Sequence, residues 1–121
     1  MRVETITVNT ILYCRNWIRT VEFYRDRLGF RETFANDWFV EFHLGGSASL
    51  SVANEEQSTM TSAEGEGITV SIEVADLSVA CDDLLQAGVE PTDVRRIWGS
   101  SSVFVFDPEG NRLEFLSRGQ L

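Results

Sequence analysis

No apolar run in this 121-residue chain approaches the roughly 20 residues that cross a membrane, and no secretory signal core opens it. We therefore expect a soluble, cytoplasmic protein. There are only two cysteines, Cys14 and Cys81, and neither belongs to a Cys-x-x-Cys motif. We interpret both as small buried apolar residues, and not as a disulfide or a metal-binding pair.

Basic residues are scarce, with ten Lys and Arg against nineteen Asp and Glu, for a net charge of −9. Such a surface repels nucleic acid and anionic membranes and favours cationic ligands. Common catalytic motifs are also missing. The chain has no glycine-rich phosphate loop, no Gly-x-Ser-x-Gly motif and no Cys–His pairing at a visible spacing. With 43% hydrophobic residues, it is long enough for one globular domain with a real core.

The same order of elements is expected twice, as strand, helix, strand, strand, strand. In the first half, the strands are expected at 3–14, 30–35, 38–44 and 47–53, with a helix from a cap at Asn16 to Gly29. A polar linker covers about 54–66. In the second half, the strands are expected at 67–74, 90–96, 101–107 and 111–117, with a helix from Asp76 to Gly88.

Matching residues recur at a nearly constant spacing along the chain. They are the helix caps Asn16 and Asp76, the helix ends Gly29 and Gly88, and the hairpin glycines Gly45 and Gly110. The caps and the helix ends have almost the same separation, and the hairpin glycines are slightly farther apart. Two copies are too few for a solenoid. The spacing therefore predicts two halves related by a pseudo-twofold axis.

Glu114 raises the question of function, because it lies inside a strand of the hairpin VFVFDPEGNRLEFLS (103–117). Side chains alternate along a strand, so Leu113 and Phe115 face the helices while Glu114 faces away. The same face is expected to carry Asn9, Ile11, Tyr13, Phe39, Glu41, His43, Thr69, Ser71 and Glu73. A mixture of apolar and polar side chains is typical of a ligand cleft, although a solvated sheet face is the alternative.

The repeat selects four positions that are expected to converge. The spacing of the hairpin glycines pairs Glu114 with Ser49, or with Ser51 if the register slips by two. The spacing of the helix caps pairs Asn9 with Thr69.

Three stretches resemble the vicinal oxygen chelate superfamily, which includes glyoxalase I, bleomycin-resistance proteins and extradiol dioxygenases. They are VEFYRDRLGF (21–30), VADLSVACDDLLQAG (74–88) and WGSSSVFVFDPEGNRLEF (98–115). The resemblance implies one α+β domain over residues 1–121, made of two βαβββ modules at about 1–53 and 67–121. Their mixed sheets would curl into a cup with the helices on the outer face. The resemblance also implies a homodimer.

Metal enzymes of this superfamily place their ligands at the four positions named above. Here only Glu114 is a typical ligand, because Asn9, Ser49 and Thr69 are neutral and bind transition metals poorly. We therefore expect neither a metal nor another cofactor at these positions. A displaced metal site stays open, formed by Glu41, His43, Glu73 and Glu114.

The favoured function is the binding of an aromatic or cationic small molecule, as in the metal-free drug-resistance members, where it sequesters an antibiotic. The expected ligand-binding residues are Asn9, Tyr13, Trp38, Phe39, Glu41, His43, Ser49, Thr69, Glu73, Trp98 and Glu114. The alternative is a lyase, isomerase or dioxygenase. It would use the displaced metal, or Glu114 as general base with His43 as its acid partner.

Overall fold

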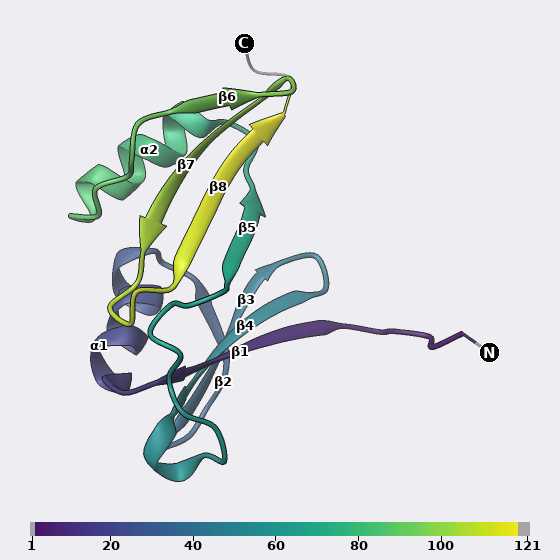
Figure 1. Ribbon diagram of the computed structural model, residues 1–121, viewed down its shortest axis with the longest axis vertical. Coiled ribbons are helices and arrows are strands. Elements are labelled where there is room, and N and C mark those ends of the chain that lie inside the picture. The colour runs from purple at the N-terminus through teal and green to yellow at the C-terminus, as the bar shows by residue number, and fades with distance from the viewer. Residues whose placement is uncertain (1, 119–121) are drawn as a thin grey trace. The chain divides into compact units, whose positions relative to one another are not determined.

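A computed structural model describes residues 2–118 (Figure 1). The chain forms two compact units that divide between Ala63 and Glu64, within the segment expected to be a linker. Each unit has one four-stranded mixed sheet and one α-helix, so the predicted α+β fold of two similar modules is confirmed. No helix in the described part of the chain is long and apolar enough to span a membrane.

Unit 1 has the predicted order of elements. They are β1 (Val8–Cys14), α1 (Trp17–Glu22) with a π-helical turn (Phe23–Arg27), β2 (Arg31–Ala35), β3 (Phe39–Gly45), β4 (Ala48–Asn54) and a 3₁₀ turn (Glu55–Gln57). The strand order is β1-β4-β3-β2, with β1 parallel to β4 and the other pairs antiparallel.

The first strand begins later than the alternation predicted. Val8 pairs with Ala48, which is the first residue of β4, so residues 3–7 have no partner strand to extend the ladder. The prediction of a strand from residue 3 is therefore wrong at its start, because alternation alone does not reveal where the neighbouring strand begins.

Unit 2 repeats the order with β5 (Thr69–Glu73), α2 (Leu77–Gln86), β6 (Arg95–Ile97), β7 (Ser100–Phe106) and β8 (Arg112–Arg118). The strand order is β5-β8-β7-β6. The strand predicted at 90–96 is correct only at its end. Pro91 has no N–H to donate to a ladder. The backbone N–H of Thr92 instead donates to the carbonyl of Phe104, and the hydroxyl of Thr92 accepts from the backbone N–H of Phe104, both at 2.9 Å.

The two α-helices begin in the same way. The side chain of Asn16 accepts a hydrogen bond from the backbone N–H of Arg19, and that of Asp76 accepts one from Val79. These N-caps satisfy donors that the first helical turn leaves free. The predicted equivalence of Asn16 and Asp76 is thus confirmed, and the spacing of these two caps relates the helices of the two units.

Each unit packs its helix against one face of its own sheet. In unit 1, Phe42, Leu50 and Val52 are fully buried, and the ring of Tyr24 lies 6.0 Å from that of Phe42. In unit 2, the core residues include Val103, Val105 and Leu113. Cys14 is buried as expected, Cys81 is only partly buried, and both are free thiols. The predicted placement of Leu113 and Phe115 on the helix side of their strand is therefore confirmed.

Candidate functional site

The sheet face of unit 1 opposite the helix carries the predicted polar and aromatic side chains. Along β3, Val40 and Phe42 are buried toward the helix, whereas Phe39, Glu41 and His43 are half-buried on the other side. Direct strand pairing places Ser49 beside both Asn9 and His43. Tyr13 lies farther along β1, on the same side as Asn9.

Asn9 has a specific partner on this face. The hydroxyl of Ser51, which is fully buried, donates to Oδ1 of Asn9 at 2.8 Å. The strand register also matches Ser51, and not Ser49, to Glu114. Ile11 pairs with Ser51 in unit 1, and Ser71, its equivalent at the spacing of the helix caps, pairs with Glu114 in unit 2. The register therefore makes Ser51, and not Ser49, the counterpart of Glu114 in unit 1.

Three aromatic rings form a cluster on unit 1. Phe39 lies between Phe34 and Trp38, with ring centroids 6.2 Å and 5.6 Å away. Close to them, the carboxylate of Glu41 accepts a hydrogen bond from the hydroxyl of Thr33 at 2.7 Å. Because Phe34 is 52% exposed, the cluster offers an accessible apolar surface beside an acid.

Phe34 was missed by sequence reasoning, and a β-bulge is the reason. Glu32 pairs with Phe42, which faces the helix, but Phe34 pairs with Glu41 on the opposite face. The extra residue between them breaks the regular alternation of the strand. Strict parity places Phe34 on the helix side, and no local signal in the sequence reveals the bulge.

On unit 2, the sheet face opposite the helix carries side-chain pairs that join neighbouring strands. Glu114 belongs to one of these pairs, which explains how a carboxylate is held within the strand. The hydroxyl of Ser71 donates to Oε1 of Glu114 at 2.7 Å. Next to it, Nε of Arg112 donates to the hydroxyl of Thr69 at 2.8 Å. Each pair joins β5 to β8 between directly opposite residues. Glu114 is half-buried, so its carboxylate is both held by Ser71 and partly open to solvent.

Arginines, which the sequence reasoning left out of the site, also lie on this face. The guanidinium carbon of Arg112 is 4.3 Å from the ring centroid of Phe104, and that of Arg95 is 5.9 Å away. Nε of Arg118 lies 3.2 Å from Oε1 of Glu73. The negative charge of Glu73, one of the expected ligand-binding residues, is therefore offset by an exposed cation. The face of unit 2 has mixed charge.

The predicted site residues fall into two sets. Unit 1 holds Asn9, Tyr13, Trp38, Phe39, Glu41, His43 and Ser49, and unit 2 holds Thr69, Glu73, Trp98 and Glu114. Trp98 is not on the sheet face. It lies in the turn between β6 and β7, with a φ of 55° and 99% of its surface exposed. The convergence of Asn9, Ser49, Thr69 and Glu114 stays a prediction.

The side chains at the positions where metal enzymes of the superfamily place their ligands do not suit a transition metal. Asn9, Ser51 and Thr69 offer neutral oxygens that already take part in hydrogen bonds with neighbouring side chains. Glu114 is the one carboxylate at these positions. Nickel, zinc and iron prefer imidazole, thiolate or several carboxylates. Within residues 2–118, no group of three or more His, Cys, Asp and Glu side chains is arranged to hold a metal ion.

A family model supplies the deciding observation. Residues 6–115 match the model of the Glyoxalase/Bleomycin resistance protein/Dioxygenase superfamily. The chain belongs to this superfamily. A search of curated proteins finds no match to the chain. The suspected membership, carried by the FYRDRLGF and DPEGN stretches, is thus confirmed.

Solved structures of this superfamily share the fold at low sequence identity. A bleomycin-binding protein from Streptomyces verticillus, complexed with copper(II)-bleomycin, is 22% identical with a TM-score of 0.73, over 98% of this chain and 100% of that one. TnmS3, an antibiotic-binding protein from Streptomyces sp. CB03234, is 15% identical with a TM-score of 0.80, over 98% and 99%. A lactoylglutathione lyase from Agrobacterium tumefaciens is 19% identical with a TM-score of 0.76, over 96% of each chain.

Proposed function

We propose that this chain binds a planar, cationic small molecule on the sheet face of unit 1 that carries Asn9 and Glu41, without a metal, and that it acts by sequestration. The observation that carries the proposal is the kind of side chain found at the superfamily's metal-ligand positions. Where metal enzymes of the superfamily place their ligands, this chain has Asn9, Ser51 and Thr69 in hydrogen bonds with neighbouring side chains. Side chains held in this way are suited to orienting a ligand and poorly suited to chelation.

The aromatic cluster of unit 1 supports a planar ligand. Phe34, Trp38 and Phe39 lie within ring-contact distance of one another, and Phe34 remains half exposed. A flat ring system gains by stacking on such rings, and a positive charge is attracted both to their faces and to the carboxylate of Glu41. The antibiotic-binding relatives are consistent with such a ligand. The net charge of −9 favours the approach of a cation.

Proflavine, a planar cation, is a suitable probe, and acridine-9-carboxylate is its anionic counterpart. We expect proflavine to raise the melting temperature and to bind at least tenfold more tightly than the anion. Glu41→Gln and Phe39→Ala are each expected to weaken proflavine binding about tenfold, because each removes one attractive contact of about 1 kcal/mol or more. Isothermal titration calorimetry measures both differences.

Glu90→Gln is the matched control, because Glu90 is exposed and lies outside both sheet faces. Its affinity for proflavine should equal that of the unaltered protein. Equal affinity for the cation and the anion would contradict the proposal. So would a nickel, zinc, iron or manganese ion that binds stoichiometrically and raises the melting temperature.

We also propose that the chain forms a homodimer. Strand β1 is an edge of its sheet, and it exposes Val8 by 61% and Ile11 by 39%. Exposed apolar side chains on an edge strand favour association. Sedimentation equilibrium at micromolar concentration should give about twice the chain mass of 13.6 kDa. A single-chain mass throughout that range would overturn this part of the proposal.

A further inference from the structure

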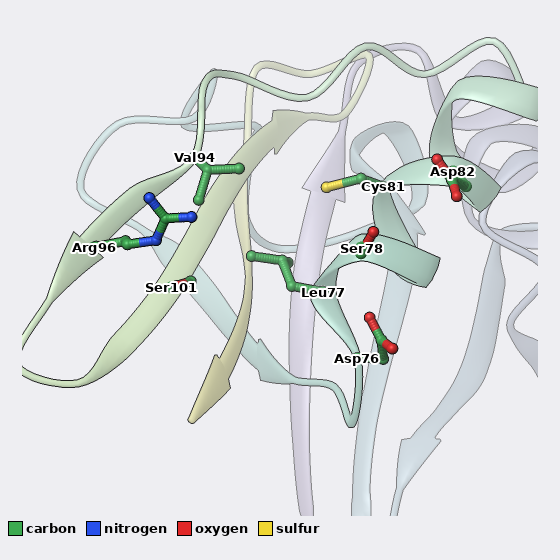
Figure 2. Close-up of a pocket in the computed structure, with 8 residues that line it drawn as sticks. All are labelled: Asp76, Leu77, Ser78, Cys81, Asp82, Val94, Arg96 and Ser101. Carbon is green, nitrogen blue, oxygen red and sulfur yellow. The ribbon is translucent and has the colours of Figure 1, made fainter. Parts of the chain in front are cut away.

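On the helix side, each unit has a groove between its α-helix and its sheet. In unit 1, the indole N–H of Trp17 donates to the carbonyl of Val52 at 3.0 Å, and the cavity beside the ring has a volume of about 340 Å³. In unit 2, Leu77 stands at the position of Trp17, and the cavity volume is about 560 Å³. Arg96 and Asp82 lie on opposite sides of this larger groove (Figure 2), so their charges do not converge on one point.

A second cavity of unit 2, at the end of the sheet where β7 turns into β8, brings a charge and an aromatic ring together. Its volume is about 460 Å³, which is within the size range of small-molecule sites. Its lining residues are Gly65, Gly67, Ile68, Thr69, Phe106, Gly110 and Arg112. Among the described residues, Arg112 is the one charged residue that lines it. The wall of this cavity is therefore positive, although the whole chain has a net charge of −9.

Strand register places Phe106 next to Arg112. The two residues are direct partners in the β7–β8 ladder. Residues paired in this way have Cβ atoms about 4.5–5.5 Å apart. Phe106 is also 55% exposed. Its ring therefore offers an accessible apolar surface beside a cationic side chain.

The guanidinium of Arg112 is held in a fixed orientation. Its Nε donates to the hydroxyl of Thr69 at 2.8 Å, and its central carbon lies 4.3 Å from the ring centroid of Phe104. Within residues 2–118, no carboxylate forms an ion pair with it. Glu114, the next acid along β8 on the same face, is held by Ser71. The outer N–H groups of Arg112 thus stay available, and its fixed orientation reduces the entropy lost when it binds a carboxylate.

Backbone forms the side of the cavity opposite these side chains. Gly65 approaches Gly110 so closely that an added Cβ would overlap the Gly110 carbonyl, so the segment before β5 is packed against the turn between β7 and β8. A Cβ at Gly67 would meet no protein atom within 4 Å. The glycines therefore leave room for a ligand next to the sheet.

We propose that this cavity binds an aromatic carboxylate. The carboxylate pairs with the N–H groups of Arg112, and the ring attached to it stacks against Phe106. The charge and the ring of such a ligand are separated by a single bond, which matches the direct pairing of the two residues. A neutral aromatic compound gains nothing from the guanidinium, and a small inorganic anion gains nothing from the ring. The site lies in unit 2 and takes an anion, so it is distinct from the site proposed in unit 1 for a planar cation.

The probe is 2-naphthoate, and 2-naphthamide is its neutral counterpart with the same ring system. We expect 2-naphthoate to bind with a Kd of roughly 0.1–1 mM, because one ion pair and one ring contact at an accessible surface supply limited affinity. The amide should bind at least tenfold more weakly. Nuclear magnetic resonance titration of the isotope-labelled chain measures both affinities, and the shifted amide signals should include those of Gly67, Phe106 and Arg112.

Matched variants test the two side chains. Arg112→Gln and Phe106→Ala should each weaken 2-naphthoate binding about tenfold, whereas Phe106→Tyr keeps a ring and should bind like the unaltered chain. Arg95→Gln is the control for charge, because Arg95 lies 5.9 Å from the Phe104 ring centroid but does not line the cavity. Its affinity for 2-naphthoate should change less than twofold.

The two proposed sites can be separated in the same set of proteins. Glu41→Gln should leave 2-naphthoate binding unchanged, and Arg112→Gln should leave proflavine binding unchanged. Equal affinity for 2-naphthoate and 2-naphthamide, an unaltered affinity in Arg112→Gln, or no saturable binding of 2-naphthoate at millimolar concentrations would overturn the proposal for unit 2. Each of these outcomes leaves the proposed function of unit 1 standing.

Discussion

Replacing Asp107 with alanine is expected to lower the free energy of unfolding by about 3 kcal/mol, because it leaves buried donors unsatisfied at about 1–3 kcal/mol for each such group. Asp107 is only 5% exposed, and its Oδ1 accepts hydrogen bonds from the backbone N–H groups of Glu109 and Asn111, both at 2.9 Å. Its Oδ2 accepts a third from the side chain of Asn111, also at 2.9 Å. Alanine removes all three acceptor contacts at once.

Urea unfolding followed by circular dichroism measures this loss. Asp93→Ala is the control, since Asp93 is exposed in the same unit, and a change within about 0.5 kcal/mol is expected. The loss of unfolding free energy in Asp107→Asn should lie between those of Asp107→Ala and Asp93→Ala. It keeps an acceptor for the backbone, but its amide N–H₂ faces the N–H₂ of Asn111. A loss below about 1 kcal/mol in Asp107→Ala would mean that these bonds do not hold the turn.

Gly65→Ala is expected to cost a similar amount, about 3 kcal/mol, through backbone strain and a steric conflict. Gly65 has a φ of +84°, where an L side chain is strained. Moreover, an added Cβ would overlap the carbonyl group of Gly110 and lie 3.0 Å from the backbone nitrogen of Asn111. These are backbone atoms of the turn that leads into β8, and they do not move aside as a flexible side chain does.

Gly67→Ala separates the strain from the overlap. Gly67 has a φ of +76°, but a Cβ there meets no atom within 4 Å. Its cost should therefore be the conformational part alone, about 1 kcal/mol. The comparison uses the same urea experiment. If the two alanine variants lose equal stability, the close approach of Gly65 to Gly110 does not contribute.

Features set by local chemistry could be predicted from the sequence. The caps Asn16 and Asp76 were found because a short polar side chain before an apolar helical stripe has a clear physical role. The side of the sheet on which Glu114 lies was found because parity along one regular strand is fixed. Both predictions depend only on residues close to one another along the chain.

Features set by strand register were missed or left open. The choice between Ser49 and Ser51 depends on how β1 pairs with β4, and the pairing shows this only once the strands are placed together. The contact of Arg112 with Phe104 likewise depends on the β7–β8 register. The bulge at β2 moves Phe34 to the face of Glu41. Such long-range pairings carry no short sequence signal.

The indole of Trp17, anchored to Val52, marks a place where the two halves of the fold differ. A fold built twice usually suggests two equal grooves, but Trp17 stands where unit 2 has Leu77, and the cavity beside it measures about 340 Å³ against about 560 Å³. Duplication of the fold therefore does not by itself make the two halves equivalent as binding surfaces.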